Sequence, residues 1–316
     1  MKPFRSDILF LYNGKYYIPN GDSFTGEQRY DEVLGKILVS DVRIKRYFRD
    51  HVLDMLKLDS PKAKDLIIYV TEVTEEEIKT NDLKGTSAAA RTALLRKLFP
   101  DIENIRELLC KCIDVRLFGG ISTVKGDEED SIHITGPVQF ALLSPSMNKV
   151  TPRDHQNTSV FKSNLTKAQG AIGTTTLVPY SLNQIAGWVN PATAVDTNLS
   201  EEDVIFMIQG IWDGINNKNT RSKCNQSSVL AVKINYADSL TCKNENLDTL
   251  IQIIPVEGKK SEDIRSLEDF TFDFSRLTDA ITSDLVASVN YRCTNPIVLK
   301  AFKEATTTVA EKMSAI

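Results

Sequence analysis

Cysteine and histidine are scarce, and their spacing gives no recognisable metal site. The chain of 316 residues has five cysteines and three scattered histidines. Cys110 and Cys112 form a C-x-C pair, but no second Cys/His pair follows at zinc-finger spacing. An odd number of cysteines in a long chain without a visible secretion signal predicts reduced thiols in the cytoplasm. We therefore expect no metal site and no cofactor.

Long apolar runs and the motifs of common enzymes are also missing. No stretch approaches the ~18 apolar residues of a membrane span, and the apolar segment 8–12 is too short for a signal peptide. The sequence has no nucleophile elbow, no Walker loop and no H-x-x-x-H pair. These absences predict a protein that has no membrane partner and no catalytic residues.

Basic charge is not in excess either, which weighs against a protein that coats nucleic acid. The formal net charge is −4, and the content of 41% hydrophobic and 25% charged residues is ordinary for a soluble globular protein. The distribution is uneven, because Lys and Arg concentrate in 43–49, 149–167 and 218–223. A chain of acidic net charge can therefore still carry a local basic groove.

The strongest local signal is a cationic helix that follows a polar, glycine-punctuated loop. Ser40 is a suitable N-cap for a helix over 41–56, with Ile44, Phe48 and Val52 on one face. The other face carries four cations: Arg43, Lys45, Arg46 and Arg49. A helix N-terminus attracts phosphate, and exposed cations extend that attraction along a polyanion. The alternative is an ordinary solvated face.

The order of expected elements predicts an α+β fold. Hydrophobic patterning and turn residues give, in order, a strand at 6–12, a helix at 41–56, strands at 112–120 and 131–142, a helix capped by Ser200 and a strand at 228–237. This βαββαβ order is the split βαβ, ferredoxin-like plan, which RRM domains share. A helix at 275–285, a strand at 286–292 and a helix from Asn295-Pro296 complete the chain.

Two segments interrupt this plan. Residues 57–110 read as an insertion with helical runs at 86–99 and 101–112. Residues 144–176 are poor in large apolar side chains, which predicts a protruding arm rather than core; an ordinary flexible loop is the alternative. The predicted domains are a palm (1–56, 111–143 and 177–316), the helical insertion (57–110) and the arm (144–176).

Other residues are candidates for contact with RNA. Arg221 and Lys223 lie in a polar, basic loop between a helix and a strand. Arg116 and Phe118, beside Gly119 and Gly120, place a cation and a ring where a backbone could approach closely, although sheet packing is the alternative. Asn20 and Asp22 either hold the first loop or, for Asp22, assist phosphodiester cleavage through a metal.

An ordered set of segments resembles a known family. The set comprises "RSDILFLYNGKYYIPNGDSF", "ILVSDVRIKRYFRD", "DVRLFGG", "ITGPVQFALLSPS" and "LVPYSLNQIAGWVNP", followed by "LSEEDVIFMIQGIWDGINNKNTRSK". Together they resemble the CRISPR-associated backbone subunit of the type I-B Cascade complex, a member of the RAMP superfamily. The resemblance runs from residue 5 to about residue 236.

This resemblance implies an RRM-like palm with a protruding thumb hairpin at roughly 145–175. Members of the family stack head-to-tail in a helical filament along a guide RNA (crRNA) and present it to target DNA in antiviral defence. They act beside other Cascade subunits, and a recruited helicase-nuclease does the cutting. The implied RNA contacts are Asn20, Asp22, Ser40, Arg43, Lys45, Arg46, Arg49, Arg116, Phe118, Gly119, Gly120, Lys149, Arg153, Lys162, Lys167, Arg221 and Lys223.

Two other functions remain open from the sequence. The first is a metal-dependent RAMP endoribonuclease that cleaves target RNA with Asp22. The second is a free-standing RRM-like RNA chaperone that forms no filament. The three hypotheses differ in whether RNA is cut and in whether copies assemble on it.

Overall fold

A seven-stranded sheet organises the chain. The computed structural model describes residues 1–81, 87–123, 131–158, 172–240 and 246–316. The sheet has the order β14-β13-β10-β1-β9-β6, and β8 adds to β9. Its strands are β1 (Ser6–Tyr17), β6 (Val138–Phe140), β8 (Arg153–Thr158), β9 (Ile172–Val189), β10 (Gln226–Tyr236), β13 (Val286–Arg292) and β14 (Met313–Ala315). All neighbours are antiparallel except β13 and β14.

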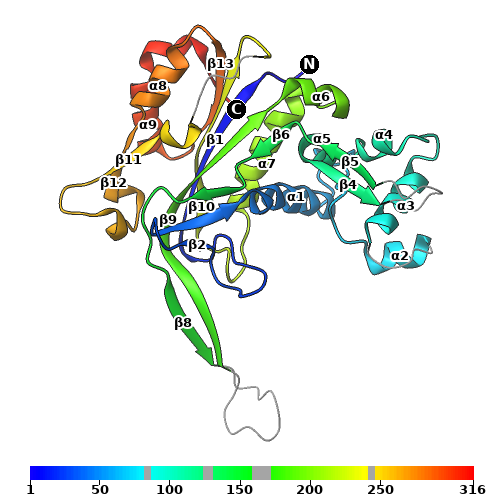
Figure 1. Cartoon of the computed structure of the whole chain (residues 1–316), viewed down its shortest axis with the longest axis horizontal. Coiled ribbons are helices and arrows are strands. Elements are labelled where there is room, and N and C mark those ends of the chain that lie inside the picture. Colours follow the sequence, from blue (N-terminus) through cyan, green and yellow to red (C-terminus); the bar gives the residue numbers. More distant parts are fainter. Residues whose placement is uncertain (82–86, 124–130, 159–171, 241–245) are drawn as a thin grey trace, which may run out of the picture.

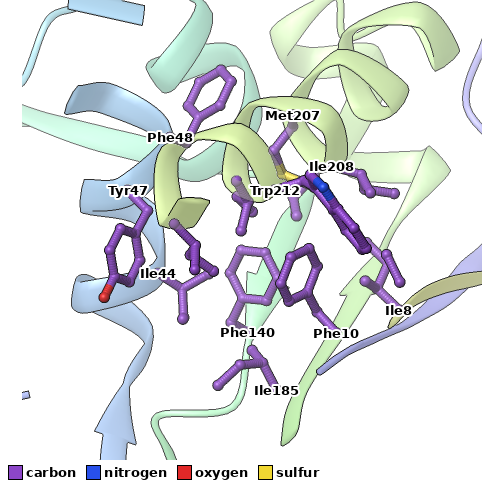
Figure 2. Packing of buried hydrophobic residues seen from close by; sticks show 14 of the residues in the cluster. Ile8, Phe10, Ile44, Tyr47, Phe48, Phe140, Ile185, Met207, Ile208 and Trp212 are labelled. Atoms are coloured by element: carbon purple, nitrogen blue, oxygen red, sulfur yellow. The ribbon is translucent and has the colours of Figure 1, made fainter. Parts of the chain in front are cut away.

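Two long helices cover one face of this sheet. They are α1 (Asp41–Lys57) and α7 (Glu201–Asn216), and Ser200 caps α7 in the expected capping box. Their apolar faces meet side chains of the sheet, as Figure 2 shows for Phe10, Phe140 and Trp212. The rings of Phe10 and Trp212 pack edge to face with centroids 6.0 Å apart. Each buried side chain of this size contributes roughly 1.5–3 kcal/mol to folding.

The C-terminal part covers the other face. It contains α8 (Ser275–Thr282), α9 (Pro296–Ala305) and the hairpin of β11 (Gln252–Pro255) with β12 (Phe270–Asp273), which lie together in Figure 1. Leu9 and Leu11 of β1 pack into this second core, whereas Ile8 and Phe10 face α1 and α7. Burial on both faces explains why the first strand reads as a continuous apolar run. The expected C-terminal helix, strand and helix are confirmed.

A smaller core lies to one side of the sheet (Figure 1). Around it lie α3 (Ala88–Leu98), α4 (Ile105–Leu109), α5 (Ile113–Phe118), β4 (Gly119–Thr123) and β5 (Ser131–Thr135), with α2 (Glu75–Asn81) outside the core. Leu95, Leu108 and Val115 are buried there together with Ile134. Since Ile134 belongs to this core, the small unit continues beyond residue 110, where the sequence placed its end.

The strand expected at 112–120 is wrong. Residues Ile113–Phe118 form α5, and only Gly119 and Gly120 begin β4. The carboxylate of Asp114 is fully buried, where it accepts hydrogen bonds from the N–H groups of Tyr69 and Val70 and from Arg49. The alternating pattern of the expected strand placed Asp114 on the solvent-exposed face. The partners of Asp114 are distant in the chain, so the local pattern gives no sign of its burial.

The strand expected at 131–142 is two strands. Gly136 and Pro137 divide it into β5, which pairs with β4, and β6, which pairs with β9. The βαββαβ order therefore runs β1, α1, β6, β9, α7 and β10. Its first and last strands and both helices are the expected segments, and only the two middle strands differ. The remaining short elements are β2 (Tyr30–Asp31), β3 (Lys36–Ser40), β7 (Leu143–Pro145) and α6 (Pro191–Thr197).

The segment expected to protrude from 144 onward starts inside the protein. Ser144, Ser146, Asn148 and Val150 are buried, and the amide of Asn148 bonds the backbone of β9. Several buried side chains of this segment are polar, and that of Asn148 hydrogen-bonds the backbone. This explains why a segment of the core contains few large apolar residues. Only from Arg153 does the chain leave the body, as the hairpin of β8 with β9 that projects in Figure 1.

Gly119→Ala is expected to destabilise the protein by more than about 1 kcal/mol. Gly119 has φ +76°, and a Cβ there would lie 2.1 Å from the carbonyl oxygen of Ile134. Gly26 is a matched control, because its φ is +74° and nothing lies within 4 Å of the added Cβ. Urea unfolding should show a clearly larger loss for Gly119→Ala than for Gly26→Ala. Equal losses would contradict the close approach of β4 and β5.

Candidate nucleic-acid interface

The start of α1 is held by the first loop. Ser40 caps the helix by accepting a hydrogen bond from the N–H of Arg43 at 3.4 Å. Asn20 fixes Ser40 in turn, since its Oδ1 accepts from the Ser40 N–H at 2.6 Å and from the Ser40 hydroxyl at 2.7 Å. Asn20 therefore positions the positive end of a 17-residue helix dipole.

Three of the four helix cations do not form the free basic face that the sequence predicted. Lys45 pairs with Asp41 at 2.8 Å, and Arg46 pairs with Asp50. Arg49 is only 8% exposed and pairs with buried Asp114 at 2.8 Å. Lys45 and Arg49 each have a carboxylate of their own, whereas Arg46 shares Asp50 with Lys218, whose ammonium lies 2.8 Å from Oδ2. These pairs reduce the attraction of the three cations for a polyanion.

Arg43 differs from its neighbours because it packs on a ring instead of a carboxylate. Its guanidinium carbon lies 4.0 Å from the centre of the Tyr47 ring. Its Nε and Nη2 are buried and have no hydrogen-bond acceptor among the residues that the structure describes. Buried N–H groups of a cation that lack an acceptor are costly. An anion that bound here would supply the missing acceptors.

Lys223 brings a second cation to the same place. Its ammonium is partly buried and donates to the carbonyl oxygen of Ile18 at 2.5 Å. Burial, and then repulsion from the guanidinium of Arg43, lowers the pKa of Lys223 to about 8. No ion pair of the described ranges includes Arg43 or Lys223. Two neighbouring cations without a carboxylate partner form a site that favours an anion.

Tyrosines that the sequence did not single out complete this site. The Tyr47 hydroxyl donates to Gln226 at 2.6 Å, which holds the ring under Arg43. The Tyr12 hydroxyl is buried and has no partner among the described residues, and this burial raises the pKa of Tyr12 well above its usual value. The i,i+4 spacing of Arg43 and Tyr47 is the one sequence signal for this arrangement.

Asp22 serves the first loop. Its Oδ1 accepts from the N–H groups of Phe24 at 2.8 Å and Thr25 at 3.4 Å, and its Oδ2 pairs with Arg29 at 3.0 Å. The hydrogen bond from Phe24 has the largest part in holding the pKa of this carboxyl below its usual value. The turn therefore occupies one carboxylate oxygen and Arg29 the other.

Arg116, Phe118, Gly119 and Gly120 lie apart from this site. Arg116 pairs with Asp203 at the start of α7 at 3.0 Å. Phe118 is 7% exposed and packs edge to face on Phe48. Gly119 and Gly120 pair with β5, and the missing side chain of Gly119 allows the close approach of the Ile134 backbone. These residues favour the packing alternative.

The remaining predicted contacts surround the projecting hairpin. Arg153 is exposed at the start of β8, and Arg221 donates to the Thr175 hydroxyl of β9 at 3.4 Å. Lys149 is exposed, and its backbone N–H bonds Ser261. Lys162 and Lys167 lie outside the described residues. Among the candidates, the structure therefore brings together two sets. Asn20, Ser40, Arg43 and Lys223 meet at the start of α1, and Lys45, Arg49, Phe118, Gly119 and Gly120 line one common pocket. Arg221 is two residues from Lys223 in the chain.

The described residues show neither a metal-binding cluster nor a membrane-spanning helix. In the described ranges, no three His, Cys, Asp or Glu side chains are grouped so that they could hold a metal ion. No helix of the same ranges has the length and apolar character needed to cross a membrane. The cysteines that the structure describes, Cys110, Cys112, Cys224 and Cys293, are free thiols.

Comparison of sequences finds related proteins. The family described as "CRISPR-associated protein Cas7" matches residues 4–275. A CRISPR-associated protein Cas7 of Haloferax volcanii is 26% identical over 299 residues, which cover 88% of this chain and 82% of that protein. The family match includes β1 to β12 and the candidate site, and it ends at the start of α8.

Comparison of structures finds similar folds. A chain of a CRISPR RNA-guided surveillance complex matches with a TM-score of 0.51 and 14% identity, covering 92% of this chain and 90% of that one. A chain of a surveillance complex described as pre-nicking matches with a TM-score of 0.50 and 14% identity, covering 96% and 100%. At this identity the likeness establishes the fold alone.

Arg49→Ala is expected to cost about 3–5 kcal/mol of stability, because it leaves the buried carboxylate of Asp114 without its cation. Arg46→Ala is the control on the same helix. Its side chain is 59% exposed, so it should cost less than about 1 kcal/mol. Chemical denaturation measures both variants. Similar stability of the two would contradict the structural assignment of Arg49.

Proposed function

Since this chain belongs to the CRISPR-associated Cas7 family, we propose that it is a guide-RNA-binding backbone subunit of a type I-B CRISPR surveillance complex. In this proposal copies assemble head-to-tail in a helical filament along the crRNA. The guide bases then pair with target DNA, while protein contacts go to the RNA backbone. Other Cascade subunits and a recruited helicase-nuclease act beside it in the cytoplasm, and the subunit itself is non-catalytic.

The observation that carries the proposal is the cation pair at the start of α1. Arg43 and Lys223 have buried or half-buried charges, and Arg43 has buried N–H groups without acceptors among the described residues. Phosphate oxygens of an RNA backbone supply both the negative charge and the acceptors. The positive end of α1, positioned by Asn20 and Ser40, favours the same group.

The finer architecture follows the same proposal. The elements β1, α1, β6, β9, α7 and β10 form an RRM-like palm, and the hairpin of β8 with β9 acts as the thumb. The helical unit between α1 and β6 is the insertion. Arg153, at the start of the hairpin strand β8, extends the positive track from the α1 site toward the thumb.

The endoribonuclease alternative has less support from the geometry. It requires a carboxylate that is free to hold a metal, whereas both oxygens of Asp22 are engaged by the turn and by Arg29. The free-standing chaperone differs from our proposal only in assembly. The number of copies on one guide RNA therefore distinguishes it.

Arg43→Ala and Lys223→Ala are each expected to weaken guide-RNA binding and to lower the slope of log K against log salt by about one unit. Each variant removes one phosphate-neutralising cation. Fluorescence anisotropy with a labelled guide RNA, titrated at several salt concentrations, measures both quantities. RNA recovered from the titration with Mg²⁺ should be intact.

Lys300→Ala serves as the matched control, because it removes an exposed cation from α9. It should leave affinity and salt slope unchanged. Wild-type slopes for both site variants would remove the proposed phosphate site. Regularly spaced RNA products that disappear in Asp22→Ala would instead favour the endoribonuclease.

Guide-RNA affinity should fall as the pH rises from 7 to 9. The pKa of Lys223 in the free protein is about 8, so its charge is largely lost above that pH. A bound phosphate stabilises the charged form, which couples binding to uptake of a proton. Lys223→Arg keeps its charge over this range and should remove the dependence. An unchanged pH profile in this variant would contradict the coupling.

A further inference from the structure

A hydrogen-bonded turn presents an aromatic ring to solvent beside the candidate RNA site. Phe24 is 99% exposed at the tip of the turn Asp22–Gly26. The N–H groups of Phe24 and Thr25 donate to Asp22 Oδ1, and the Gly26 N–H donates to the Asp22 carbonyl oxygen at 2.9 Å. Gly26 supplies the positive φ of +74° that closes the turn. The exposure of Phe24 is therefore built into a hydrogen-bonded turn.

The surroundings of Phe24 favour a protein partner over RNA. Glu27 is exposed beside the turn, and the carboxylate of Asp22 is partly exposed. The one cation of the turn region, Arg29, is paired with Asp22. Such an acidic rim repels phosphates, whereas it suits an apolar pocket with basic groups at its edge. Fully exposed large aromatic side chains are common anchors of protein interfaces.

The same chain carries a pocket of that kind at the base of the hairpin. Its apolar walls are Tyr16, Ile18 and Leu177, and its basic groups are Arg221 and His155. Tyr16 is 61% exposed, so part of this apolar lining faces solvent. Phe24 does not line the pocket of its own chain. The pocket is therefore open to a side chain from outside.

We propose that Phe24 of one copy fills the Tyr16–Leu177 pocket of the next copy, with Glu27 facing Arg221 and His155. A projecting side chain and a pocket that it does not line in its own chain make the two parts of a heterologous contact, which extends along the RNA when each copy uses both. The proposal rests on the proposed function, because it names surfaces that join consecutive copies along the RNA. It adds the specific side-chain contact through which one copy docks on the next.

A disulfide experiment tests this contact directly. Cys224 lies at the pocket, with its thiol 3.6 Å from the Arg221 carbonyl oxygen and 3.9 Å from that of Tyr16. In Phe24→Cys, mild oxidation of full-length protein with guide RNA should link the new cysteine of one copy to Cys224 of the next. Non-reducing gels should show a ladder of multimers, and the ladder should disappear in Phe24→Cys/Cys224→Ser.

Val33 offers a matched control. It is 95% exposed on a second turn of the same construction, in which Asp31 Oδ1 accepts from the N–H groups of Val33 and Leu34 at 3.0 and 2.9 Å. Val33→Cys should give no ladder through Cys224. A ladder of equal strength from Val33→Cys would show unspecific oxidation and overturn the proposal.

The outcomes separate this inference from the proposed function. Several copies on one RNA without a ladder would overturn the Phe24 contact and leave the RNA-binding function intact. A monomer with a disulfide between position 24 and Cys224 would show that the turn reaches the pocket of its own chain, and this would overturn the proposal. Ultraviolet cross-linking of RNA to Tyr16 would assign the pocket to an RNA base and would also overturn it. If RNA does not bind, the proposed function fails, and a ladder in concentrated RNA-free protein still decides the contact.

Phe24→Ala should reduce cooperativity between copies by at least about tenfold.

Discussion

The charge of Arg43 is the constraint on which this account depends. A guanidinium that is partly buried against Tyr47 needs acceptors for its N–H groups, and the described chain leaves two of its nitrogens without any. Lys223 increases the need, because the two cations repel each other where water is partly excluded. Such an arrangement is stable at modest cost only if an anion or ordered solvent completes it. The electrostatics at the start of α1 therefore favour the binding of an anion.

Other cations of α1 have the negatively charged partners that Arg43 lacks among the described residues. Arg49 and Asp114 form a buried pair that joins α1 to α5, and the same carboxylate holds the backbone at Tyr69 and Val70. This pair connects the main sheet to the small helical unit. One helix therefore combines cations that maintain the fold with a cation that remains available to a ligand.

Sequence reasoning worked where structure is determined locally. The caps of α1 and α7 and the C-terminal elements follow from hydroxyl, Asn-Pro and apolar spacing, which act within a few residues. It failed at α5, because the burial of Asp114 depends on Arg49, a partner distant in the chain. The pairs Asp41–Lys45 and Arg46–Asp50 stand at i,i+4 and were visible in the sequence, but only the structure shows that they neutralise the expected basic face. The approach of Lys223 to Arg43 depends on the tertiary fold.

A structure determined with a bound guide RNA tests the central claim most directly. The account predicts a backbone phosphate oxygen within about 3 Å of Arg43 Nη2 or Nε and of the Lys223 ammonium. RNA that follows another surface, with ordered water alone at Arg43 and Lys223, would contradict it.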